Sequence, residues 1–172
     1  LIYQGVTNGD LHRITVNDVK LRKGTVFIRG ERRSSFNKGS VRRELPLEAL
    51  QIIDLIEYID DIRPRILAGA YNNSPGRKPE KDNIVFRTDQ LLLSLGGSQN
   101  LTSSMLHMFR NLKQIDPQVK NATQIRQSVI STWLTKHDLR KVQYMAGHRY
   151  VSSTEHYKKI DQAALPKGLH KT

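Results

Sequence analysis

A chain of 172 residues, 37% of them hydrophobic, is long enough to bury one substantial core, and its length favours a single domain. Lysine and arginine number 28 against 16 acidic residues, and this balance of +12 is typical of proteins that bind nucleic-acid phosphates. No apolar run approaches the roughly 18 residues of a membrane helix and no signal-peptide pattern opens the chain, so we expect no membrane association. The absence of cysteine excludes disulfide frameworks and thiolate metal sites.

The first half of the chain predicts a small sheet followed by one helix. Short extended segments separated by Gly24 and a polar hairpin predict three antiparallel strands, at residues 19–21, 25–29 and 42–45. Apolar residues then recur at the spacing of a helix face packed on a core, at Ile52, Leu55, Ile56, Ile59 and Ile62. We expect Pro64 to end this helix, because the residue before a proline disfavours helical geometry. The stretch 68–82, rich in Gly, Pro and Asn, predicts a long surface loop inserted within the domain.

The second half predicts four helices. Two of them, at about 102–115 and 123–135, each present an apolar face, through Met105, Leu106, Phe109 and Leu112 in the first and Ile125, Val129, Trp133 and Leu134 in the second. Asp138 is expected to cap a short helix that Gly147 ends, and Ser152 or Ser153 is expected to cap a last short helix. The predicted fold class is therefore mainly α with a small three-stranded antiparallel sheet (α+β), in one domain over residues 1–172.

The most specific motif lies near the end of the chain. Residues 139–148 read Leu-Arg-Lys-Val-Gln-Tyr-Met-Ala-Gly-His, and Tyr157 follows His148 by nine positions, after a Ser-Ser-Thr helix start. This segment resembles the C-terminal signature of the tyrosine recombinases, the phage-integrase family, in which a Gly-His pair precedes the nucleophilic tyrosine by nine residues. Tyr144 and Tyr150 lack that spacing, and we interpret them as packing residues.

Two earlier segments resemble further boxes of the same family, each with one departure. In Asn-Ala-Thr-Gln-Ile-Arg, at 121–126, Arg126 takes the arginine position of a His-x-x-Arg box, and Thr123 stands where the histidine usually is. Residues 5–18 resemble the first box, Gly-Leu-Arg-x-x-Glu-Leu-x-x-Leu-x-x-x-Asp. There Asp10 and Asp18 fit the acidic positions, while Thr7 replaces the first arginine.

A third segment resembles the hairpin that carries the family's catalytic lysine. It reads Lys-Gly-Ser-Val-Arg-Arg-Glu-Leu-Pro-Leu, at 38–47, and places Lys38 on that position, although Arg32 or Arg33 could reach the site instead. Basic residues crowd this region, which favours a hairpin that contacts phosphates. The DNA-binding residues predicted here and after the Gly-His pair are Arg32, Arg33, Arg42, Arg43 and Arg149.

The resemblance implies a fold, a reaction and a second domain that precedes this one. The fold is that of a tyrosine-recombinase catalytic domain, and the family's DNA-clamping domain is expected to precede Leu1. Tyr157 would attack the scissile phosphate of duplex DNA to form a 3′-phosphotyrosine, and the freed 5′-hydroxyl would attack a second strand without metal, ATP or other cofactor. Arg126 and His148 would stabilise the charge on the phosphate, and Lys38 would protonate the leaving oxygen.

The loss of the arginine at Thr7 and the histidine at Thr123 leaves the activity open. The chain is expected to be either a recombinase of a mobile element or chromosomal system, acting as a tetramer on DNA in a bacterial cytoplasm, or a degenerate relative that binds DNA without cleaving it. An RNA-binding protein is disfavoured by the aromatic content of 6%. The arginines that could compensate for these two losses are Arg13, Arg32, Arg33 and Arg149. The spacing of His137, His148 and His156 matches no closed metal site, so we expect no metal.

Overall fold

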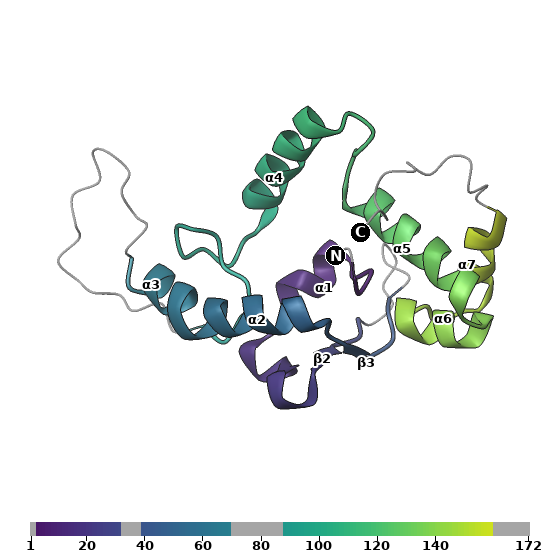
Figure 1. Cartoon of the computed structure of the whole chain (residues 1–172), viewed down its shortest axis with the longest axis horizontal. Coiled ribbons are helices and arrows are strands. Elements are labelled where there is room, and N and C mark those ends of the chain that lie inside the picture. Colours follow the sequence, from purple (N-terminus) through teal and green to yellow (C-terminus); the bar gives the residue numbers. More distant parts are fainter. Residues whose placement is uncertain (1–2, 32–38, 70–87, 160–172) are drawn as a thin grey trace.

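The structure, a computed structural model, describes residues 3–31, 39–69 and 88–159 (Figure 1). Helices predominate in these ranges, beside one three-stranded antiparallel sheet, which confirms the predicted fold class. The α-helices are α1 (Asn8–Arg13), α2 (Ala49–Glu57), α3 (Arg63–Leu67), α4 (Thr102–Ile115), α5 (Ala122–Lys136), α6 (Leu139–Ala146) and α7 (Ser152–Glu155). Short 3₁₀ turns lie at Val16–Asp18, Leu21–Lys23 and His156–Lys159. Within the described ranges, no helix is long and apolar enough to cross a membrane.

The sheet has the order β1-β2-β3, with β1 at Val19–Lys20, β2 at Thr25–Ile28 and β3 at Arg43–Pro46. Gly24 makes the turn between the first two strands with a φ of 63°, a left-handed conformation that suits glycine. Val26 pairs with Leu45 and Ile28 with Arg43, and directly opposed residues share one face of a sheet. Because Val26, Ile28 and Leu45 are buried, this register also directs Arg43 into the core.

A long helical segment covers this core. Its side chains Leu55, Tyr58 and Ile59 pack on the cluster that contains Val26 and Leu45. The segment continues from α2 through a π-turn at Tyr58–Ile62 into α3, so the prediction that Pro64 ends the helix was wrong. In the π-turn the Arg63 N–H bonds to the Tyr58 carbonyl, five residues back. This wider turn accommodates the proline ring, which would clash with the preceding turn of a regular α-helix.

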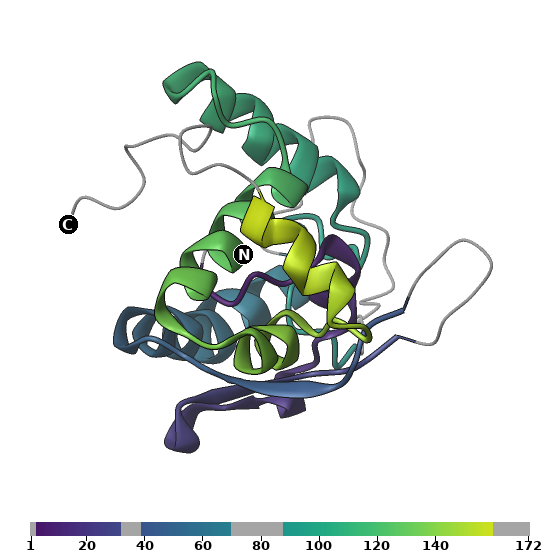
Figure 2. The same ribbon diagram turned by 90° about the vertical axis from the view of Figure 1, so that its right-hand side faces the viewer.

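A second core packs the last helices together. Figure 2 views the molecule from the side on which these helices lie. Ile130 of α5 and Val142 and Ala146 of α6 are fully buried there. Asp138 caps α6 by accepting hydrogen bonds from two backbone N–H groups at 3.0 Å, and Gly147 ends the helix with a φ of 69°, as predicted. The prediction for α7 was wrong in its cap: the N-cap is Val151, and both Ser152 and Ser153 lie inside the helix.

Helix α4 stands apart from the rest of the described chain (Figure 1). Its bounds agree with the prediction, but none of its residues is buried. Met105, Phe109 and Leu112 are half-buried, and Leu106 is exposed. The apolar spacing therefore predicted the helix correctly and its packing incorrectly. Most of the predicted loop at 68–82 lies outside the described residues.

Candidate active site

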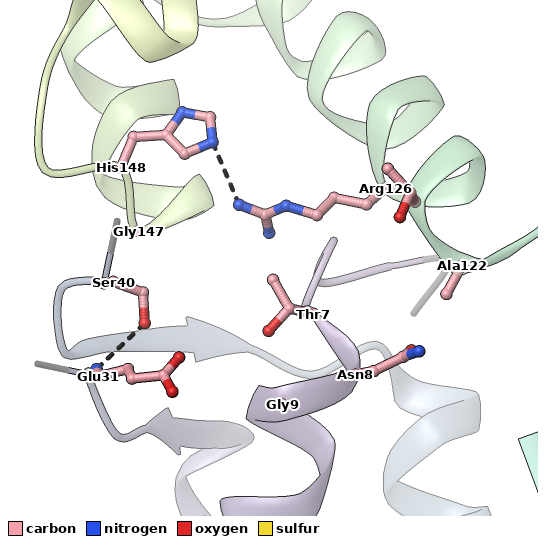
Figure 3. Close-up of a pocket in the computed structure, with 11 residues that line it drawn as sticks. Thr7, Asn8, Gly9, Glu31, Ser40, Ala122, Arg126, Gly147 and His148 are labelled. Atoms are coloured by element: carbon pink, nitrogen blue, oxygen red, sulfur yellow. Dashed lines mark hydrogen bonds between the residues drawn. The ribbon is translucent and has the colours of Figure 1, made fainter. Parts of the chain in front are cut away.

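A hollow in the surface is formed by all four segments that resemble family boxes (Figure 3). It lies between the start of α1, the base of the β2–β3 hairpin, the start of α5 and the turn after α6. Its lining residues are Thr7, Asn8, Gly9, Glu31, Gly39, Ser40, Ala122, Thr123, Arg126, Gly147 and His148. The tertiary fold thus gathers residues that are more than a hundred positions apart in the chain.

Arg126 connects three of these segments through its guanidinium. It projects from α5, whose N-cap Asn121 accepts the Gln124 N–H. Nη1 donates to the carbonyl of Gly5, while Nη2 donates to the carbonyl of Ala146 at 2.6 Å and lies 3.2 Å from Nε2 of His148. Burial, and then the nearby Arg43, lower the pKa of Arg126, but a guanidinium stays charged in proteins. The group is therefore a fixed cation at the floor of the hollow.

The contacts of His148 define its tautomer. Because Arg126 can only donate, Nε2 of His148 must accept, and so Nδ1 carries the proton and donates to Oγ1 of the buried Thr154 at 2.9 Å. Burial, followed by the charges of Arg126 and Arg43, lowers the pKa of His148 to about 4. The imidazole is thus neutral near pH 7 and held from both ring nitrogens.

Tyr157 packs against the face of the His148 ring. It follows α7 in the 3₁₀ turn, and its ring stacks on the His148 ring with centroids 5.6 Å apart and planes 14° apart. A second hollow, which shares Gly39 and His148 with the first, is lined by Tyr157 and Arg149. The structure therefore brings Arg126, His148 and Tyr157 into one contiguous group.

The two departures from the family pattern both line the first hollow. Thr123 is exposed at the start of α5. Thr7 is the N-cap of α1: its Oγ1 accepts the Asp10 N–H, and the Asp10 carboxylate accepts the Thr7 N–H, each at 3.0 Å. The threonine that replaces an arginine therefore has a structural role of its own, since such a capping box satisfies two free N–H groups.

Arg43 does not lie on the DNA-binding surface that we expected for it. Its side chain is fully buried, donating from Nη2 to Asp10 at 3.1 Å and from Nε to the carbonyl of Met145 at 3.0 Å. Although burial alone would raise the pKa of Asp10, Arg43 and the hydrogen bonds from Thr7 lower it. Arg43 therefore connects α1, β3 and α6 from beneath, where no phosphate reaches it.

Gly147 leaves the space that Arg43 occupies. A Cβ at this glycine would lie 2.3 Å from Nη1 of Arg43, far inside contact distance. Sequence reasoning missed this packing role of the Gly-His pair. It also missed Asp10 as a buried anchor, Thr154 as the partner of His148, and Glu31 as a lining residue.

The other predicted site residues divide between surface positions and undescribed ones. Arg42 and Arg149 are exposed. Lys38, Arg32 and Arg33 lie outside the described residues. Across the described ranges, no cluster of three or more His, Cys, Asp or Glu could hold a metal ion.

Comparisons with known proteins identify one family model and several similar folds. The model of the phage integrase family matches residues 2–163. Similar solved structures include XerA recombinase, at 23% identity and a TM-score of 0.64 over 95% of this chain and 52% of that one. XerH site-specific recombinase bound to palindromic difH substrate gives 19% and 0.63 over 94% and 40%. The Tn1549 transposon integrase in complex with transposon right end DNA gives 14% and 0.62 over 91% and 51%.

The similarity to these structures is a similarity of fold. The chain spans about half the length of the proteins it matches. No curated protein matches it in sequence.

Proposed function

Because this chain belongs to the phage integrase family, whose model spans residues 2–163, we propose that it is the catalytic part of a site-specific DNA recombinase that cleaves and rejoins strands through a 3′-phosphotyrosine. The observation that carries the proposal is the contiguous group of Arg126, His148 and Tyr157, in which each side chain contacts the next. These box residues, predicted from two separate segments, form one group beside two adjoining hollows, which a structural role for each alone does not explain.

The chemistry requires a nucleophile and fixed donors around the phosphate. The Tyr157 oxygen attacks phosphorus, the P–O5′ bond breaks, and the 5′-oxygen takes a proton, for which Lys38 is the proposed acid. Negative charge gathers on the nonbridging oxygens and is stabilised by donors that are already oriented. Arg126 offers a planar guanidinium held by two carbonyls, so it needs little reorganisation to serve that purpose.

The neutral His148 suits the handling of protons more than the stabilisation of charge. Its Nε2 has an acceptor lone pair on the side of Arg126, and its ring lies on Tyr157. When a phosphate displaces the Arg126 contact, this nitrogen becomes available to accept the phenolic proton. The Arg149 side chain, exposed in the adjoining hollow, would contact the DNA backbone.

The proposed substrate is duplex DNA, and the proposed assembly is a homotetramer. The basic balance of +12 supports DNA, as do the XerH and Tn1549 relatives, whose structures contain their DNA substrates. Exchange between two duplexes cuts four strands, and one tyrosine for each cut gives four subunits. We propose a bacterial, cytoplasmic protein associated with a mobile element or with chromosomal DNA.

A nicked suicide duplex tests the proposal. Loss of the short fragment beside the nick prevents religation and traps the covalent protein–DNA complex, which a denaturing gel resolves. We expect the complex with the unmodified protein and with Tyr144→Phe, whose tyrosine is exposed and lines neither hollow. Tyr157→Phe should give none, because the phenolic oxygen bonds to phosphorus. A complex in Tyr157→Phe refutes the nucleophile; binding without any complex supports the degenerate DNA-binding alternative.

A further inference from the structure

Four side chains of alternating charge lead from the interior to the rim of the candidate active site. Arg43, fully buried, donates to one carboxylate oxygen of Asp10, and Nη2 of Arg13 donates to the other at 3.0 Å. The second terminal nitrogen of Arg13, Nη1, lies 3.3 Å from the carboxylate of Glu31. Glu31 lines the first hollow, where Figure 3 shows its carboxylate on the side of Thr7. The series thus ends where a phosphate would bind.

The Arg13 side chain folds back along α1 towards the start of the helix. Gly9 lies one turn earlier and lines the hollow beside Thr7. A Cβ at Gly9 would lie 3.2 Å from Nη1 and 3.6 Å from Nη2 of Arg13, tighter than ordinary contact for the first. Because Gly9 has no side chain, the guanidinium can lie immediately behind the residues that line the hollow. This place is at the N-terminal end of α1, where the family carries its first arginine.

Glu31 holds this guanidinium weakly. The side chains of Arg13 and Glu31 are 31% and 37% exposed, and pairs as exposed as this contribute about 0–1 kcal/mol. Their separation of 3.3 Å exceeds the roughly 2.7–2.9 Å of strong charge-assisted hydrogen bonds. Nε of Arg13 is buried and has no hydrogen-bond partner among the described residues. A phosphodiester anion entering the hollow can therefore compete with Glu31 for Nη1.

We infer that Arg13 is the second cationic donor to the scissile phosphate, in place of the arginine that position 7 lacks, and that Glu31 occupies its Nη1 until DNA displaces the carboxylate. Nη2 stays on Asp10 throughout, so the guanidinium exchanges one partner and keeps its anchor. Arg149 is a weaker candidate, because it lines the hollow beside Tyr157 and not the wall behind Thr7. The catalytic part of this inference rests on the proposed recombinase function, whereas the contact between Arg13 and a phosphate does not.

The rate of covalent-complex formation on the nicked duplex tests the catalytic part. Arg13→Ala should slow it by about 10²–10³, the usual effect of losing one oriented donor. Adding Thr7→Arg to Arg13→Ala should recover at least about tenfold, the lower part of that range, because it restores a cation to the family position. Glu31→Gln should accelerate the reaction. The matched control is Arg29→Ala: Arg29 pairs with Asp18 of a second Thr-Asp capping box, lines neither hollow, and should react like the unmodified protein.

DNA affinity across a salt series tests the contact without any cleavage, using an intact duplex and fluorescence anisotropy. Arg13→Ala should lower the slope of log K against log salt by about 0.9, the value for one phosphate contact, and Glu31→Gln should raise affinity. An unchanged slope in Arg13→Ala overturns the inference even if cleavage is lost, because Arg13 then acts only by supporting Asp10. A lower slope in a protein that never forms the covalent complex supports the contact and refutes the proposed recombinase function instead.

Discussion

Replacing Gly147 with alanine is expected to destabilise the protein far more than the backbone conformation alone requires. Gly147 has a φ of 69°, and a left-handed conformation costs a non-glycine residue about 1–2 kcal/mol. The added methyl would also lie 2.3 Å from Nη1 and 2.7 Å from Cζ of Arg43, so the guanidinium must shift, and we expect the shift to break its contact with Asp10. Breaking a buried ion pair costs about 3–5 kcal/mol, which brings the expected loss in the free energy of unfolding to about 4–7 kcal/mol.

Gly24→Ala is the matched control for that measurement. Gly24 has nearly the same φ, 63°, but its Cβ would meet only Cδ1 of Ile52, at an ordinary 3.5 Å. Urea unfolding followed by circular dichroism should therefore separate the two variants by roughly 1 M or more in midpoint. In an Arg43→Met background the Gly147→Ala cost should fall to that of Gly24→Ala, because the clashing group is gone. Equal losses for the two glycines in the unmodified background would refute the packing of Arg43 beneath Gly147.

Two further predictions concern pH and salt. The folded protein holds the pKa of His148 at about 4, below its ordinary 6.5, so as the pH falls the unfolded chain protonates this histidine first. The stabilisation that the neutral imidazole gives the fold is therefore complete above pH 6.5 and is lost as the pH falls towards 4. Over the 2.5 pH units between 6.5 and 4 the loss should be about 3–4 kcal/mol, at about 1.4 kcal/mol for each pH unit, and it should be absent in urea titrations of His148→Gln. The folded protein lowers the pKa of Asp10 and of Asp18 from 3.8, so most of their contribution is lost below this window. The +12 balance predicts that affinity for duplex DNA falls steeply between low and moderate salt, and a flat response in anisotropy titrations would contradict a phosphate-binding surface.

Local periodicity predicted most elements because their determinants are local. The three strands, α4, α5 and α6 follow from spacing, and Asp138 and Gly147 mark the ends of α6 through cap chemistry that depends on a few neighbouring residues. The convergence of Arg126, His148 and Tyr157 could be predicted only from the resemblance, since nothing local brings the start of α5 to the turn after α6.

The wrong predictions depend on tertiary context. Pro64 remains within a helical segment because a π-turn accommodates it, and the spacing of apolar residues does not indicate that turn. Leu106 belongs to an apolar stripe, but a stripe predicts a helix without showing what covers it. Arg43 is different, because its burial had a signal: in β3 it alternates with the buried Leu45, and a period of two places both on the core face. Its charge led us to assign it to the surface, where arginine is usually found.

The burial of Arg43 also decides how much positive charge the site can offer a phosphate. Its guanidinium is compensated by Asp10, His148 is neutral, and Glu31 adds a negative charge to the lining. Glu31 is in turn paired with Arg13, so among the described residues in and beside the hollow Arg126 remains as the uncompensated cation. A phosphate therefore meets a single net positive charge in the hollow as it stands. The reaction that we propose must accordingly draw cations from beyond this lining: Arg13, released from Glu31, and Lys38, which precedes the lining residue Gly39 in the chain. DNA binding and assembly of the catalytic charge are then one coupled event.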